Sequence, residues 1–163
     1  MSIELGSEEE LEEKFLKLQY RLAQIEKVES CQNSFLSFVR SMWPEFIAGR
    51  HHKIMAEKLE RVANGELKRL IINMPPRHTK SEFASFLFPA WMIGKKPAMK
   101  IIQATHTTEL AVNFGRKVKN LLEREDYLEM FPEAALSADS KASGRWDTAR
   151  GGMYYGVGVG SNL

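Results

Sequence analysis

The order of apolar runs in residues 67–105 constrains the fold more than any other feature of this 163-residue chain. Residues 70–74 form a short, nearly continuous apolar run, a helix-forming stretch extends from about Lys80 to Ile93, and residues 100–105 form a second apolar run. Such alternation is typical of a strand, a crossover helix and a second, parallel strand. The pattern predicts an α/β fold with a parallel sheet and flanking helices.

The junction between the first strand and its helix, residues 75–82, reads Pro-Pro-Arg-His-Thr-Lys-Ser-Glu. Lys80 and Ser81 match the end of the phosphate-loop pattern G-x-x-x-x-G-K-[ST], whereas Met74 and Thr79 occupy the positions of its two glycines. A helix N-terminus, a lysine and a hydroxyl that helps to hold Mg²⁺ are the groups that a triphosphate requires.

Neighbouring residues add to this chemistry and also limit it. Arg77 offers a guanidinium that suits phosphate oxygens, and His78 offers a further donor. Pro75 and Pro76 have no amide hydrogen, so part of the usual backbone cradle is missing. Two interpretations are open for this segment alone: a phosphate site, or a basic, proline-stiffened turn without a ligand.

The first part of the chain is predicted to be helical. Ser7 and Glu10 form a capping box, and the apolar residues that follow recur at alternating steps of four and three: Leu11, Phe15, Leu18, Leu22 and Ile25. Two heptads are fewer than a coiled coil usually needs, so residues 1–30 are expected to form an amphipathic helix packed on its own domain. Further helices are expected over 35–43 and from His52 to Asn64-Gly65.

The second half is predicted to continue with a helix and a hairpin. Thr107 or Thr108 caps the helix, whose Leu110, Phe114, Val118 and Leu121 are expected to face the sheet. Residues 137–144 are a loop, and residues 145–148 and 153–159 form the hairpin, in which an apolar face alternates with a nearly bare one.

Charge and composition exclude few partners. A formal net charge of +2 and a pI near 8.6 are too mild to indicate nucleic-acid binding. The single Cys31 cannot form an internal disulfide, and no apolar stretch approaches the roughly 20 residues of a membrane span. A soluble intracellular protein without a membrane partner is expected.

Six segments, read together, resemble the large terminase subunit of tailed bacteriophages. They are residues 49–59, 65–81, 88–91, 103–111, 114–118 and 151–158. The resemblance extends from about Phe35 to the end of the chain, in the order and spacing of the family. A proline pair followed by Arg-His before the loop lysine is common in that family. Residues 31–163 are thereby expected to be part of a P-loop NTPase-like ATPase domain, without the nuclease domain.

The resemblance implies an ATP-driven motor that moves viral DNA into a procapsid. Its cofactors would be ATP and Mg²⁺, and its partners double-stranded viral DNA, the small terminase subunit, the portal protein and further copies of itself, in the host cytoplasm. Lys80 would hold the β- and γ-phosphates, Ser81 would ligate Mg²⁺, and Arg77 would contact or sense the phosphates, with His78 and Thr79 in the same loop.

The family also suggests roles outside the loop. His51 and His52 lie where it places residues near the adenine, although adjacent histidines on a helix are more often surface or packing residues. Gln103, Thr105 and Thr107 look like the motif that couples nucleotide state to DNA, and helix capping is their alternative role. Arg116 would contact DNA or a neighbouring subunit, or simply face solvent.

Hydrolysis requires acids that we do not find. An apolar strand ending in a carboxylate pair should organise Mg²⁺ and activate water, but the nearest candidate, residues 121–126, continues a helix. The chain is therefore expected to be a catalytically incomplete, truncated terminase. Two alternatives are a fragment of a helicase-like nucleic-acid-dependent ATPase and a non-enzymatic module that binds DNA or a protein.

Overall fold

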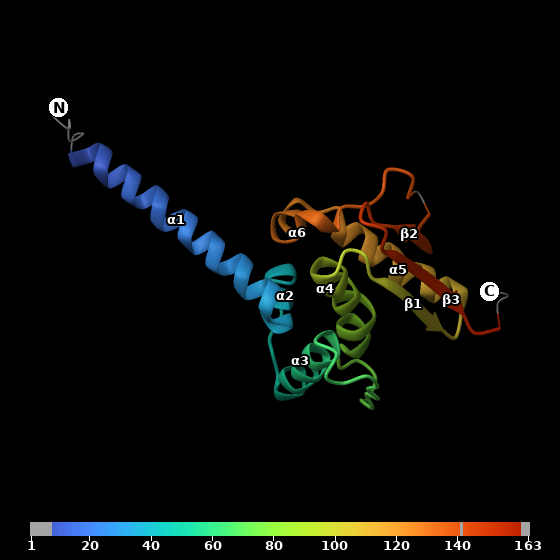
Figure 1. Cartoon of the computed structure of the whole chain (residues 1–163). Helices are drawn as coiled ribbons and strands as arrows, with labels where there is room; N and C mark the ends of the chain where they lie inside the picture. The colour runs from blue at the N-terminus through green and yellow to red at the C-terminus, as the bar shows by residue number, and fades with distance from the viewer. Residues whose placement is uncertain (1–7, 141, 161–163) are drawn as a thin grey trace.

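The computed structural model of this protein describes residues 8–140 and 142–160 (Figure 1). The helices are α1 (Glu8–Asn33), α2 (Phe35–Met42), α3 (Arg50–Ala63), the π-helical η1 (Glu82–Leu87), α4 (Phe88–Lys95), α5 (Thr108–Leu122), α6 (Glu125–Met130) and the 3₁₀ turn η2 (Pro132–Ala134). The strands are β1 (Lys100–Thr105), β2 (Arg145–Asp147) and β3 (Met153–Gly158). Within these described residues, none of the helices has both the length and the apolar character of a membrane span.

The three strands form one mixed sheet in the order β1-β3-β2. β1 and β3 are parallel, with Lys100 opposite Met153 and Thr105 opposite Gly158. β2 and β3 are antiparallel and form the predicted hairpin. The protein is therefore an α/β protein with an N-terminal helix, as expected from the sequence.

The prediction of a strand at residues 70–74 is wrong. This segment has no regular secondary structure, and in the described structure it is not part of the sheet. Leu70, Ile72 and Met74 pack against the hydrophobic core, whereas Ile71 is 86% exposed. A strand needs a hydrogen-bonded neighbour, and an apolar run cannot show from its own residues that such a neighbour is present.

The hydrophobic core lies mainly among the helices, around one phenylalanine. Phe35, at the start of α2, is fully buried, and its ring lies 5.5 Å from that of Phe83, 5.6 Å from Phe88 and 5.4 Å from Trp91. Ser34 caps α2, and Trp91 Nε1 donates to the Cys31 carbonyl. The residues after Lys80 are thus anchored to the N-terminal helices.

Glycines on β3 allow α5 to approach the sheet closely. A Cβ atom at Gly156 would lie 2.9 Å from the Ala111 carbonyl oxygen, and one at Gly158 would lie 2.4 Å from the Thr108 nitrogen. The bare face of the hairpin is therefore the face that α5 covers. The expected buried face of α5 is correct for Val118 and Leu121, whereas Leu110 and Phe114 are only half-buried. The prediction missed two buried residues of α5, Ala111 and Gly115.

Helix α1 projects away from the rest of the molecule (Figure 1). Its side chains from Glu8 to Lys27 are exposed, and the predicted capping residue Ser7 lies outside the described residues. Only the last turns are attached, through buried Cys31 and through Gln32 Nε2, which donates to the Met130 carbonyl at 2.7 Å. The expectation that this helix packs on its own domain is wrong for most of its length.

Candidate functional site

The segment between Met74 and the helix adopts a backbone that non-glycine residues rarely take. Arg77 has φ of 65° and Thr79 has φ of 57°, both in the left-handed region. Thr79 occupies the position of the second glycine in the phosphate-loop pattern. Glycine is the residue that most readily adopts left-handed backbone angles. At this position the loop therefore has a backbone conformation that glycine adopts more readily than threonine.

Lys80 begins a helical stretch that runs to Lys95 through η1 and α4. Its side chain is half-buried and turns back toward the start of the loop, where Nζ lies 3.4 Å from the Met74 carbonyl oxygen. Ser81 follows in the first turn and is exposed. The first amides of a helix have no intrahelical acceptor, so Lys80 and Ser81 supply a cation, a hydroxyl and backbone donors at adjacent positions.

A buried histidine from α3 holds the loop in this shape. His52 Nδ1 accepts the Gly49 N–H at 3.0 Å, so the ring proton lies on Nε2, which is 2.5 Å from Thr79 Oγ1. The Thr79 hydroxyl in turn donates to the His78 carbonyl at 2.7 Å. His52 is only 7% exposed and both its nitrogens are engaged within the chain. This arrangement gives His52 a loop-positioning role, whereas His51 is exposed.

We expect Thr79→Gly to change the free energy of unfolding by less than about 1 kcal/mol. Glycine relieves left-handed strain of roughly 1–3 kcal/mol but removes a hydrogen bond worth roughly 0.5–1.5 kcal/mol and makes the unfolded chain more flexible. Thr79→Val is the matched control, because it keeps the strain and removes only the hydroxyl. Urea denaturation should show Thr79→Val to be the less stable of the two variants, and the reverse order would contradict a strained loop.

The protonation of His52 should make stability depend on pH. Burial is the main cause that lowers the pKa of His52, and the positive charges of His51 and His78 lower this pKa further. At a pH near 6.5, the ordinary pKa of histidine, the unfolded chain therefore binds a proton at this position more readily than the folded chain does. The free energy of unfolding should fall as the pH decreases below that value. Urea denaturation between pH 5 and 7 should show a weaker pH dependence in His52→Gln than in His106→Asn, which removes an exposed histidine.

Two neighbouring hollows lie along this part of the chain. Residues 75–82 line a cavity of about 180 Å³. A second hollow of about 260 Å³ is mostly apolar and is lined by His51, Ile54, Met55, Lys58 and residues 70–74. The two meet along the chain at Met74 and Pro75, and the His51 and His78 rings lie 5.9 Å apart. A small anionic group and a flat apolar group could lie side by side here.

The only acidic residue lining the smaller cavity is held by a lysine. Glu82 accepts from Lys117 Nζ of α5 at 2.7 Å, and this Nζ also lies 5.7 Å from the centre of the Phe86 ring. Because the carboxylate is paired, its repulsion of an anion in the cavity is reduced. The loop retains the positive character of Arg77 and Lys80, whose side chains are exposed and half-buried respectively.

The proposed coupling residues are occupied within the sheet and the following turn. Thr107 is the N-cap of α5 and accepts the Leu110 N–H, which was the alternative role given to it. Thr105 Oγ1 donates to the Thr107 carbonyl at 2.7 Å. Gln103 Oε1 accepts from Tyr154 Oη, while Gln103 Nε2 is buried without a hydrogen-bond partner in the described structure. The bonds of Thr105 and Thr107 stabilise the turn from β1 to α5, and the bond of Gln103 joins β1 to β3.

Arg116 and the acidic segment lie elsewhere. Arg116 is exposed, donates to Asn113 Oδ1 at 2.7 Å and borders a surface hollow of about 420 Å³. Residues 121–126 were expected to continue a helix; they are not a strand, but α5 ends at Leu122 and α6 begins at Glu125, so two helices meet here. Asp126 pairs with Arg124, whose hydrogen bonds lower the pKa of that carboxyl. Among the described residues, no group of three or more His, Cys, Asp or Glu side chains is arranged to hold a metal ion.

Sequence reasoning missed the His52 to Thr79 contact, which joins residues 27 positions apart. The sequence offered one signal, the position of His52 in a predicted helix, and that signal does not identify the residue that the side chain contacts.

Comparison with protein-family models, curated proteins and solved structures finds no match to this chain.

Proposed function

We propose that residues 75–82 bind the phosphates of a nucleoside triphosphate, as ATP with Mg²⁺, in a P-loop-like manner. The observation that carries the proposal is the left-handed Thr79 directly before Lys80, whose ammonium folds back over the loop. Such a backbone directs amide hydrogens toward an anion, and a flexible lysine then neutralises its charge.

Each neighbouring group has a role in this proposal. Lys80 contacts the β- and γ-phosphates, Arg77 approaches them from the exposed side of the loop, and His78 supplies a further donor. Ser81 provides one oxygen ligand for Mg²⁺, which usually keeps several waters. The base lies in the apolar hollow beside His51, since the two cavities adjoin at Met74 and Pro75.

The wider function rests on the resemblance to large terminase subunits. In that proposal the chain is the ATP-binding part of a motor that packages double-stranded viral DNA in the host cytoplasm. The small terminase subunit, the portal protein and further copies of the chain would be its partners, and Gln103, Thr105, Thr107 and Arg116 its coupling and contact residues. The acids that would organise hydrolysis are not identified in this sequence, so binding without turnover is the proposed activity of the chain alone.

Calorimetric titration of the chain with Mg-ATP, adenosine and tripolyphosphate tests the proposal. Heat with ATP and with tripolyphosphate, and little with adenosine, would support phosphate recognition by the loop. Absence of any ATP heat would favour a module that binds DNA or protein through the same basic residues. Tighter ATP binding with single-stranded than with double-stranded DNA would favour the helicase-like alternative.

A further inference from the structure

Helix α1 carries a seam of apolar side chains that the rest of the described structure does not cover. Five residues share one side of the helix: Leu11, Phe15, Leu18, Leu22 and Ile25. They are 48–63% exposed, although leucine, isoleucine and phenylalanine side chains gain most from burial. We call these five residues the α1 seam. Their spacing of four and three residues is that of the contact positions in a two-stranded coiled coil.

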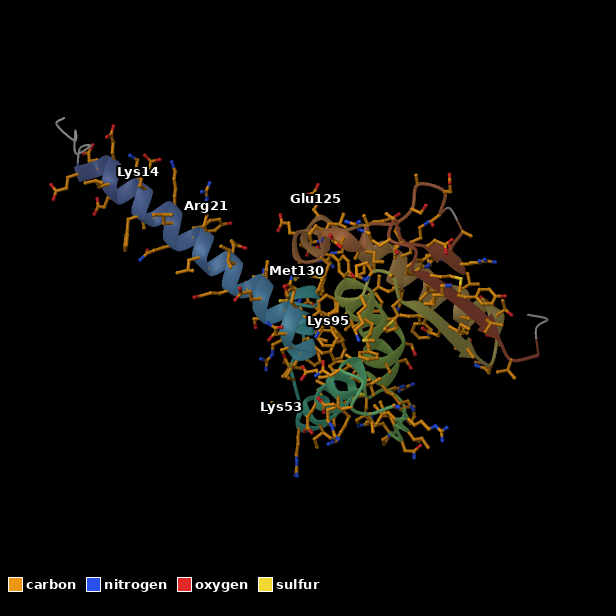
Figure 2. All side chains as sticks on the ribbon, viewed as in Figure 1. Lys14, Arg21, Lys53, Lys95, Glu125 and Met130 are labelled. Carbon is orange, nitrogen blue, oxygen red and sulfur yellow. The ribbon has the colours of Figure 1, made fainter. Side chains whose placement is uncertain are left out.

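The residues that flank the α1 seam differ in charge on its two sides. Lys14 and Arg21 precede Phe15 and Leu22 on one side. Glu12, Gln19 and Glu26 follow Leu11, Leu18 and Ile25 on the other. All five are exposed, and Figure 2 shows Lys14 and Arg21 on the part of α1 that stands away from the body. One helix therefore carries both halves of a complementary charge pattern.

We propose that the α1 seam is a self-association surface on which two copies of this chain pair with their α1 helices parallel. In a parallel pair, each basic flank residue meets the residue five positions later on the partner. Arg21 then meets Glu26 of the second copy, and Lys14 meets its Gln19. Both contacts are compatible, and the five apolar side chains bury one another.

The opposite orientation brings like charges together. In an antiparallel pair, the basic flank of one helix faces the basic flank of the other, so Lys14 approaches Arg21 and Glu12 approaches Glu26. Such contacts are repulsive. The charge pattern therefore selects a parallel second copy. The α1 seam spans only about two heptads, because the next contact position after Ile25 is the charged Glu29, so the association is weak and concentration-dependent.

The attachment of α1 leaves the seam accessible. The helix meets the body only near its C-terminal end, through residues such as Cys31 and Gln32. The exposed part, from Glu8 to Lys27, precedes these contacts. Two copies can therefore bring their α1 seams together without changing the packing of either core.

Sedimentation equilibrium of the complete chain over a wide concentration range tests the proposal. The dimer fraction should rise with concentration, and Phe15→Asp with Leu22→Asp should weaken dimerisation by about a hundredfold or more. The matched control is Leu16→Asp with Tyr20→Asp, which adds the same charge on the opposite side of α1 at residues that are 62% and 67% exposed. Circular dichroism should show equal helicity in both variants.

A charge substitution tests the orientation. Arg21→Glu should weaken a parallel dimer by roughly tenfold, and adding Glu26→Arg should restore it. Strengthening by Arg21→Glu would indicate an antiparallel pair and overturn the proposal. It would also be overturned by a chain that stays monomeric at every concentration, or by a control variant that loses dimerisation as fully as the seam variant.

Discussion

Replacing Lys80 with alanine is expected to weaken Mg-ATP binding about tenfold to a hundredfold. The substitution removes a charge-assisted contact to phosphate, worth roughly 1.5–3 kcal/mol. Little effect on folding is expected, because the Lys80 side chain is only half-buried and its one described hydrogen bond, to the Met74 carbonyl, is long at 3.4 Å. Isothermal titration calorimetry of both proteins at one ionic strength measures the difference.

The control for this experiment is Lys53→Ala. Lys53 is an exposed lysine on α3, the helix that also carries His52, so its removal changes the net charge equally without altering the loop. Binding by Lys53→Ala should match that of the parent chain. If Lys80→Ala and the parent chain bind Mg-ATP with equal affinity, the loop does not bind phosphate, and any ATP that binds does so elsewhere on the protein.

Phe35→Ala should lower the free energy of unfolding by about 3–5 kcal/mol, as truncation of a large buried side chain leaves a cavity. Phe35 is fully buried and its ring contacts four other aromatic rings, those of Phe38, Phe83, Phe88 and Trp91. Because a domain of ordinary stability has only about 5–15 kcal/mol in total, this loss is large. Urea denaturation followed by circular dichroism gives the value.

Tyr20→Ala serves as the matched aromatic truncation. Tyr20 is 67% exposed and lies on the side of α1 opposite to the α1 seam. Its replacement should change stability by no more than about 0.5 kcal/mol, as is usual for surface positions. A similar loss in both variants would mean that Phe35 is not the centre of the core.

Local signals predicted most of the helices correctly. Thr107 caps α5 as predicted, and Gly65, with φ of 80°, ends α3 next to Asn64 as the Asn-Gly pair suggested. These features depend on residues within one turn of each other, so the sequence contains them directly. The hairpin of β2 and β3 was predictable for the same reason.

Features that depend on distant partners were not predictable. The run at residues 70–74 has the composition of a strand, but its place outside the sheet depends on which strands lie next to β1. Likewise, the exposure of α1 depends on what the rest of the fold leaves uncovered. Periodicity identifies an apolar face and does not identify what that face contacts.

The sequence predicted the chemical groups of the candidate site but not the contacts that hold the loop in its conformation. Lys80 and Ser81 follow from a pattern of adjacent residues. The left-handed conformation of Thr79 was not predictable, because threonine rarely adopts it. The hydrogen bond that stabilises this conformation comes from His52, on another helix. The pattern glycines are absent, yet Thr79 has a backbone conformation that glycine adopts more readily, so residue identity alone did not predict the backbone of this loop.

The strained residues and the His52 hydrogen bonds have a consequence for recognition kinetics. A glycine-rich loop samples many conformations and loses this freedom when an anion binds. Here Arg77 and Thr79 are already in their unusual conformations, and Thr79 is tied to α3. The proposed ligand would therefore encounter a preorganised receptor, with a small entropic cost of ordering and an association step that needs no prior rearrangement of the loop.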